Sequence, residues 1–514
     1  MSAAVRDTMK SSGSAPAVEP EGAPAAVLRR EGILRSSSLS LAALAGSALF
    51  TAVLTVFLVR ALGPRQYSLF GLALAVGSIL LLPADAGISL STQRFAAEHR
   101  EDLPAIREIV AGGIRLKLAI GVIACGALFA LADPIAAAYH ARGLAWPLRA
   151  VAIAVFGQSM LGFLGGLFVS LSRVVVNLRL VLAESVTEAG ASITLVLLGA
   201  GATGAGLGRA VGYTVGALLG ALAVARSIGP GCLRLTLRRS PRTGQLARYA
   251  GALFIIDVSF SLFNQIDLIL IGALVATSSV AFFDAPARLC TVLQYPAYSL
   301  ALGIGPRLAG AERSVTDESF AAGLRVILIL QSFMLAGIVA WSGPIVHLVL
   351  GDRYQAAVPV LRTLGMYVYL SGLGAFLSIS VNYLGAARRR VPVAILALVL
   401  DVVIDLVLLP QIGVVAGAIA TDVAYATYVI GHVIICAGLL NLPRRALGIS
   451  FARCLVAAAM MTLVLAAVGT STLSPAEWLL GAVAGTAAFG AVLVVTGELT
   501  SSDAAALRAL RIRR

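Results

Sequence analysis

Charged residues are scarce in this chain: only 12% of its 514 residues are Asp, Glu, Lys or Arg, whereas a soluble domain usually has about a quarter. Hydrophobic residues make up 59%, and the mean hydropathy is +0.94. So much apolar surface exceeds what a soluble core can bury. The composition therefore excludes a soluble fold and predicts an all-α polytopic membrane protein.

Residues that carry metal or redox chemistry are also few. The five cysteines form no Cys-x-x-Cys pair and the four histidines lie far apart, so we expect neither a disulfide nor a metal site. No Walker A motif or large polar domain is present, and the predicted outer loops are too short for a polymerase or ligase of lipid-linked sugars. We expect no cofactor, no catalytic residue and no enzymatic activity.

Long apolar runs, in contrast, are abundant, and the first two define the organisation of the chain. One ends at Arg60, and the next runs from Ser68 to Leu90, with Gly63-Pro64 between them. A helix of about 20 apolar residues crosses a bilayer. The pattern predicts a transmembrane hairpin that turns at Gly63-Pro64.

The same pattern recurs later in the chain. When the sequence is aligned with itself at a shift of 212 residues, Tyr213 matches Tyr425. At a shift of 213 residues, Arg149 matches Arg362. We therefore predict about fourteen transmembrane helices, arranged as two six-helix repeats plus two C-terminal helices. The predicted parts are a disordered cytoplasmic tail (1–32), an N-terminal bundle (33–226), a basic cytoplasmic connector (227–248), a C-terminal bundle (249–440), and two extra helices with a basic tail (441–514).

The net charge of +14 gives the orientation. Most lysines and arginines fall in segments that lie inside if the N-terminus is cytoplasmic, so we expect both termini on the cytoplasmic face of the plasma membrane. Arg209 is assigned to an outer loop, and only Arg288 falls well inside a span. The basic residues are spread over short loops without interleaved aromatics, so no nucleic acid is expected as a partner.

Two stretches carry a family resemblance. The residues Arg60-Ala61-Leu62-Gly63-Pro64-Arg65-Gln66-Tyr67 and, later, Gly351-Asp352-Arg353-Tyr354 resemble the polysaccharide transporter family. Its members are flippases of lipid-linked oligosaccharides, in the superfamily of multidrug and toxic compound extrusion transporters and the lipid II flippase. The resemblance implies two bundles around a central cavity that opens alternately to either side.

A lipid-linked sugar phosphate poses a physical problem that fits this expectation. Its polyprenyl tail can stay in the bilayer, but its charged head group needs a polar cavity with cationic groups. We therefore predict a flippase for a polyprenyl-diphosphate-linked glycan, with a glycan polymerase or ligase as a further partner. The alternatives are an ion-coupled drug or cation antiporter and a non-transporting membrane scaffold for glycan assembly.

Ionisable residues inside spans are costly, so they are the candidate site residues. Arg288 is the first candidate for the head group, because a guanidinium matches phosphate geometry. Asp284 lies one turn earlier, and a purely structural pair between the two is the competing interpretation. Asp257 and Asn264 share a face of the seventh predicted span and extend this group.

Carboxylates form a second group of candidates. Two acidic residues spaced i, i+4 share a helix face and can share a proton, which suits a coupling ion; hydrogen bonding between helices is the alternative. The coupling-ion candidates are Glu184, Glu188, Asp267, Asp401, Asp405 and Asp422. Arg94, Arg115 and Lys117 are candidates for loading the diphosphate at the inner face, although their topological role alone explains them.

Overall fold

The computed structural model describes residues 33–85, 87–99, 102–233, 265–304 and 313–499. Within these ranges the chain is helical and has no strand, and ten helices are long and apolar enough to cross a membrane. The polytopic all-α class is thus confirmed, while the count of fourteen spans and the repeat layout stay predictions. The helices are α1 (Ile33–Asp85), α2 (Ile88–Glu98), α3 (Leu103–Ala138), α4 (Ala145–Ser170), α5 (Val174–Leu197), α6 (Gly201–Ser227), the short Gln265–Leu274, α8 (Val280–Ile304), α9 (Arg313–Ile345), α10 (Val358–Tyr383), α11 (Arg390–Ile412), α12 (Val415–Leu439), α13 (Arg444–Val468) and α14 (Pro475–Val495).

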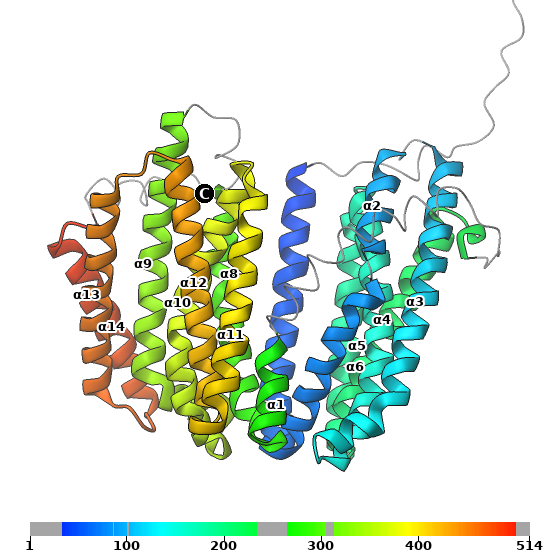
Figure 1. Cartoon of the computed structure of the whole chain (residues 1–514), viewed down its shortest axis with the longest axis horizontal. Helices are drawn as coiled ribbons and strands as arrows, with labels where there is room; N and C mark the ends of the chain where they lie inside the picture. Colours follow the sequence, from blue (N-terminus) through cyan, green and yellow to red (C-terminus); the bar gives the residue numbers. More distant parts are fainter. Residues whose placement is uncertain (1–32, 86, 100–101, 234–264, 305–312, 500–514) are drawn as a thin grey trace, which may run out of the picture.

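Helix α1 contains the predicted hairpin. It bends at Gly63, whose φ of 66° and ψ of 172° belong to a region that only glycine enters readily. Figure 1 shows two legs diverging from this bend. The turn at Gly63-Pro64 is confirmed, but the second leg ends at Asp85 and the separate helix α2 follows, where we expected one span to Leu90.

The helices gather into two groups (Figure 1). Helices α1–α6 pack on one another, with α6 against both α4 and α5, and we call them the N-half. Helices α8, α9 and α12 pack around α10, α11 packs on α12, and the pair α13–α14 attaches through α9. We call residues 265–499 the C-half.

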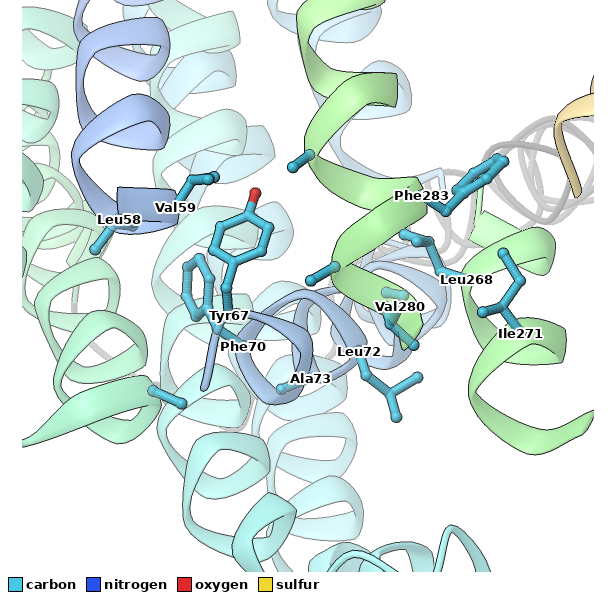
Figure 2. Close-up of a cluster of buried hydrophobic side chains, with 14 of the residues drawn as sticks. Leu58, Val59, Tyr67, Phe70, Leu72, Ala73, Leu268, Ile271, Val280 and Phe283 are labelled. Atoms are coloured by element: carbon cyan, nitrogen blue, oxygen red, sulfur yellow. The ribbon is translucent and has the colours of Figure 1, made fainter. Parts of the chain in front are cut away.

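One apolar cluster joins the halves near the bend of α1. Figure 2 draws part of this cluster, with Val59 and Tyr67 from α1 and Leu268, Val280 and Phe283 from the C-half, all of them buried. Two further apolar clusters lie entirely within one half each. Burial of apolar side chains therefore seals the halves together at one end of the molecule, which we call the closed end.

Polar contacts at the closed end satisfy backbone groups at helix ends. Ser68 Oγ donates to the carbonyl of Ser278 (2.8 Å) and accepts from the N–H of Ala281 (2.9 Å), at the start of α8. Arg60 Nε donates to the carbonyl of Val349 (3.0 Å). Terminal N–H and C=O groups have no partner within their own helix. Each of these contacts crosses between the halves, so opening this end would leave such groups unpaired.

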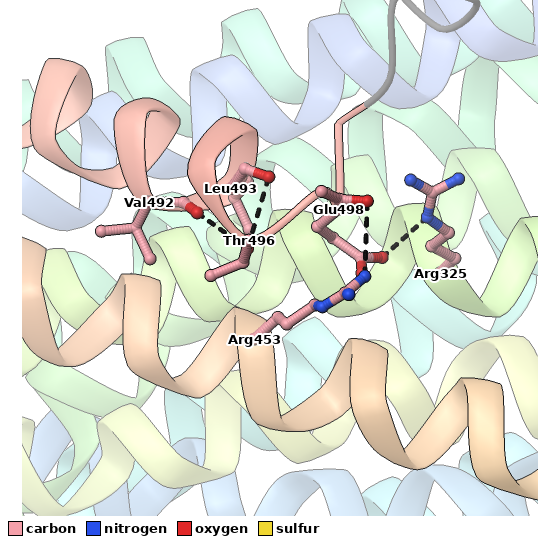
Figure 3. Close-up of polar contacts among 7 residues, drawn as sticks. Arg325, Arg453, Val492, Leu493, Thr496 and Glu498 are labelled. Atoms are coloured by element: carbon pink, nitrogen blue, oxygen red, sulfur yellow. Dashed lines mark hydrogen bonds and ion pairs between the residues drawn. The ribbon is translucent and has the colours of Figure 1, made fainter.

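A buried carboxylate fixes α14 to the rest of the C-half (Figure 3). Glu498 is 1% exposed, and it accepts from Arg325 Nε of α9 (2.7 Å) and from Arg453 Nη1 of α13 (3.3 Å). Burial acts to raise the pKa of Glu498, but the hydrogen bonds from both arginines and from Ser450 outweigh it and hold that pKa below its ordinary value. The ionised form therefore belongs to the folded state.

This lowered pKa predicts a pH-dependent contribution to stability. Because the folded-state pKa lies below the unfolded one, Glu498 stabilises the fold fully above its ordinary value of 4.5, and the contribution is lost as the pH falls through the folded value. Glu498→Gln should cost about 1–3 kcal/mol at neutral pH. Thermal unfolding in detergent should show a lower midpoint temperature for Glu498→Gln than for the wild type at neutral pH. The difference between the two midpoints should become smaller in acid.

The control is Glu98→Gln, because the ion pair of Glu98 with Arg94 is exposed and should contribute little at any pH. If the midpoint temperature of Glu498→Gln differed from that of the wild type by the same amount at neutral and acidic pH, the pH-dependent stabilisation by Glu498 would be contradicted.

Candidate functional site

Residues of both halves line two cavities in the described part of the chain. The first, of ≈ 530 Å³ including the open space at its mouth, is lined by α1, α5, α6 and α8. The second, of ≈ 430 Å³, is lined by α1, α4, α6, α8 and Gln265. Arg209 of α6 and Arg288 of α8 line both of them. One guanidinium from each half therefore faces the same space, close enough for the two to repel each other.

Arg209 is the cation of the N-half. Its Nη1 donates to Glu188 Oε1 of α5 (2.7 Å), and its Nη2 donates to the hydroxyl of Tyr213 (3.1 Å). The guanidinium carbon lies 4.8 Å from the centroid of the Tyr213 ring, within the range of a cation–π contact. These three side chains form one charge-balanced group on the cavity wall, and Glu188 thus bonds between helices as well as lining the cavity.

Glycines in α6 bring this group together. Gly208, Gly212 and Gly216 recur every fourth position, a spacing that lets two membrane helices approach closely. A Cβ on Gly212 would lie 2.6 Å from Glu188 Cβ, and one on Gly208 would lie 2.2 Å from Ser192 Oγ. Because both contacts are with α5, the close approach of α5 and α6 sets the position of Glu188 opposite Arg209.

Arg288 is the cation of the C-half. Its Nε donates to Asp284 Oδ2 at 2.8 Å, so the pair that we considered as an alternative is present, and Arg288 lines both cavities as well. Asp284 is 3% exposed, and the Tyr67 hydroxyl of α1 lies within hydrogen-bonding reach of it. A Cβ on Gly71 would lie 3.0 Å from Asp284 Oδ2. The pair is therefore braced against α1, across the boundary between the halves.

A cluster of buried carboxylates lies elsewhere in the C-half. Asp401 and Asp405 of α11 both come within interaction distance of Asp267, which accepts from Thr421 Oγ1 of α12 at 2.8 Å. No donor group in the described part of the chain bonds to either oxygen of Asp401 or of Asp405. Three buried carboxylates cannot all be ionised without compensation. The cluster is therefore suited to hold protons; among the described residues, no group of three or more His, Cys, Asp or Glu side chains is arranged to hold a metal ion.

Glu184 of α5 also lines the first cavity, whereas Asp422, Lys117, Arg94 and Arg115 line neither of the two. Asp422 lies near Cys290 and Tyr367. Lys117 is 1% exposed, pairs with Asp85 and donates to Ser89 at 3.3 Å, so it does not face solvent as loading from the inner face requires. Arg94 pairs with Glu98 (2.9 Å), Arg115 Nε donates to the carbonyl of Ala111 (3.1 Å), and Asp257 and Asn264 lie outside the described residues.

The sequence assignment of Arg209 to an outer loop was wrong. Helix α6 begins at Gly201, so Arg209 lies within this helix and on the cavity wall. The glycine-rich start of α6 resembles a loop in composition. The available signal was Tyr213, one turn after Arg209, which extends a polar face into the span.

Comparison with known families adds to this geometry. A family model described as "Polysaccharide biosynthesis protein" matches residues 33–306, more than half of the chain. The chain belongs to this family. The resemblance found in the sequence is thereby confirmed, whereas no curated protein sequence matches the chain.

Solved structures show where the fold recurs. The lipid II flippase MurJ in an inward closed conformation gives a TM-score of 0.73 at 13% identity, over 90% of this chain and 98% of that one. An inward-facing multidrug resistance MATE transporter of the MOP superfamily gives a TM-score of 0.61 at 16% identity, over 76% of this chain and 95% of that one. A eukaryotic MATE transporter gives a TM-score of 0.56 at 18% identity, over 82% of this chain and 100% of that one. At these identities the likeness establishes a shared fold.

The glycine packing of α6 can be tested directly. Gly212→Ala would force its Cβ against the Glu188 backbone and should cost about 1–3 kcal/mol through overpacking. The matched control is Gly162→Ala in α4, where an added Cβ meets no atom within 4 Å and alanine favours the helix. Thermal unfolding in detergent should show a lower midpoint for Gly212→Ala alone. Equal midpoints would contradict the close packing of α5 and α6.

Proposed function

We propose that this protein is a flippase that moves a polyprenyl-diphosphate-linked oligosaccharide across the plasma membrane for cell-surface polysaccharide biosynthesis. The observation that carries the proposal is the pair Arg209 and Arg288, which present one cation from each half to shared cavities. A diphosphate carries two adjacent anionic groups, and a guanidinium binds each through parallel N–H donors. The family description and the MurJ-like fold support a lipid-linked substrate.

The remaining cavity residues suit the rest of such a molecule. Thr51, Thr55, Ser78 and Gln158 offer hydrogen bonds to sugar hydroxyls. Phe50, Leu54 and Leu58 form an apolar wall beside them. A head group in this space would exchange water for side-chain partners, while its polyprenyl tail stays in the lipid.

The closed end defines one state of an alternating-access cycle. In the predicted orientation, with both termini cytoplasmic, the bend of α1 lies on the outer side, so the halves are sealed outside. A head group would enter from the cytoplasm, and parting of the halves at the closed end would release it. Polymerase or ligase partners outside would then consume it and keep the net movement outward.

An ion gradient is a further source of energy in this proposal. Asp267, Asp401 and Asp405 are placed to share protons in the C-half, and Glu184 with Glu188 forms an acidic pair in the N-half. The C-half cluster lines neither of the two cavities, so it can be occupied without displacing the head group. We assign it the role of coupling site.

The head-group assignment predicts a loss of transport. In proteoliposomes with a fluorescent polyprenyl-diphosphate glycan, Arg209→Gln and Arg288→Gln should each slow flipping about tenfold or more, because a charge-assisted hydrogen bond contributes about 1.5–3 kcal/mol. The control is Arg149→Gln, whose ion pair with Asp133 lies outside both cavities and which should flip at the wild-type rate.

The same assay separates the alternatives. Wild-type protein that flips no lipid-linked glycan but exports cationic drugs would replace this proposal with an antiporter. Wild-type protein that moves neither would support a scaffold. Normal flipping in both cavity variants would remove the two arginines from the mechanism.

The coupling assignment has its own test. Flipping by the wild type should accelerate under an imposed proton gradient. Asp401→Asn should lose that response while keeping the gradient-free rate within about twofold, since the cluster lines neither cavity. Asp133→Asn, an exposed carboxylate, should respond as the wild type does. A full response in Asp401→Asn would exclude the cluster as the coupling site.

A further inference from the structure

Both central arginines already hold a carboxylate. Arg209 bonds to Glu188 (2.7 Å), and Arg288 bonds to Asp284 (2.8 Å). These four charges balance, so these two ion pairs add no net charge to the cavities before a substrate enters. An incoming phosphate can reach a guanidinium fully only by taking the place of one of these carboxylates. What happens to the released carboxylate therefore decides the charge of the loaded site.

Glu188 differs from Asp284 in having a second acid beside it. Glu184 lies one turn earlier on α5, and its carboxyl group lies within hydrogen-bonding reach of that of Glu188. Glu184 is 5% exposed; one of its oxygens accepts from Ser185 Oγ (3.1 Å), while Oε1 has no partner in the described structure. An ionised carboxylate in that position would be poorly compensated. We therefore take Glu184 to be a neutral acid that donates to Glu188.

The surroundings of the pair offer little to replace Arg209. From α6 the pair faces Arg209 and Tyr213, from α1 it faces Tyr67 with Thr51 and Thr55, and from α8 it faces Arg288. Among these described lining residues, Arg288 is the one other cation, and Asp284 occupies it. A Glu188 side chain that loses Arg209 would be an uncompensated charge near hydrocarbon, which is costly.

We propose that binding of a diphosphate head group at Arg209 is coupled to the uptake of one proton by the Glu184–Glu188 pair. The phosphate takes the guanidinium from Glu188, the freed Glu188 carboxylate accepts the proton of Glu184, and Glu184 regains a proton from cavity water. Release of the head group restores the Arg209–Glu188 bond and returns the proton. This inference rests on the proposed function.

The linkage has a consequence for the transport cycle. A diphosphate diester brings two negative charges into a neutral site, and one proton lowers the net charge of the loaded cavity from two to one. The proton leaves with the head group, so it travels outward and does not itself drive export. The driving force must then come from the separate C-half cluster, the membrane potential or consumption of the product.

The test is isothermal titration of the purified full-length protein with farnesyl-diphosphate-linked N-acetylglucosamine, whose two phosphodiester charges do not titrate near neutral pH. Titration in buffers of different ionisation enthalpy counts the protons taken up per bound probe. We expect about one proton for the wild type and for Asp133→Asn, and none for Glu188→Gln. The wild-type Kd should rise up to tenfold per pH unit as the medium becomes alkaline, and that of Glu188→Gln should stay flat.

A second variant guards against misfolding of Glu188→Gln. In Arg209→Gln, Glu188 has no cation and already carries a proton, so the probe should bind weakly through Arg288 without proton uptake. If the wild type bound the probe without taking up a proton, or if Glu188→Gln took up as many protons as the wild type, the proton linkage would be overturned and the proposed substrate would stand. If proton uptake were lost in Asp401→Asn but kept in Glu188→Gln, the proton would bind in the C-half, and this result too would overturn the linkage to Glu188. A wild type that does not bind the probe would overturn the proposed substrate as well.

Discussion

A guanidinium group inside a membrane needs an anion beside it, and this requirement organises the middle of the molecule. An arginine at the centre of a membrane helix costs about 2.5–3.5 kcal/mol or more when it has no partner. Arg209 and Arg288 avoid this cost through Glu188 and Asp284. Both pairs depend on close helix packing: Gly212 admits α5 beside Arg209, and α1 packs directly against Asp284 at Gly71.

The closed end links this charged centre to the contact between the halves. Apolar side chains of both halves share one cluster there, and Ser68 and Arg60 satisfy backbone groups at helix ends of the C-half. Such contacts are either made or lost together, which favours two distinct states over a gradual deformation. Tyr67 belongs to the sealed cluster and also reaches Asp284, so the seal and the Arg288 pair share a side chain.

Local features of the sequence predicted much of this arrangement. The composition predicted a membrane protein, and Gly63-Pro64 predicted the bend in α1. Residue 63 adopts backbone angles that favour glycine. The spacing of Asp284 and Arg288 predicted their ion pair, because residues four apart on a helix are neighbours whatever the tertiary structure. Helix periodicity likewise placed Glu184 beside Glu188 and Asp401 beside Asp405.

Contacts between distant helices were beyond the same reasoning. Asp267 meets Asp401 and Asp405 although they belong to different helices, Gln265–Leu274 and α11, and no local spacing encodes that encounter. Arg209 was missed because glycines that pack helices are the same residues that make loops. Lys117 was expected near the inner face, but tertiary packing buries it with Asp85.

The most direct test is a cryo-electron-microscopy structure of the protein in nanodiscs with a polyprenyl-diphosphate monosaccharide bound. A substrate site built on paired arginines predicts the two phosphates between Arg209 and Arg288, with Glu188 no longer bonded to Arg209. A head group bound elsewhere, with both arginine–carboxylate pairs intact, would contradict it.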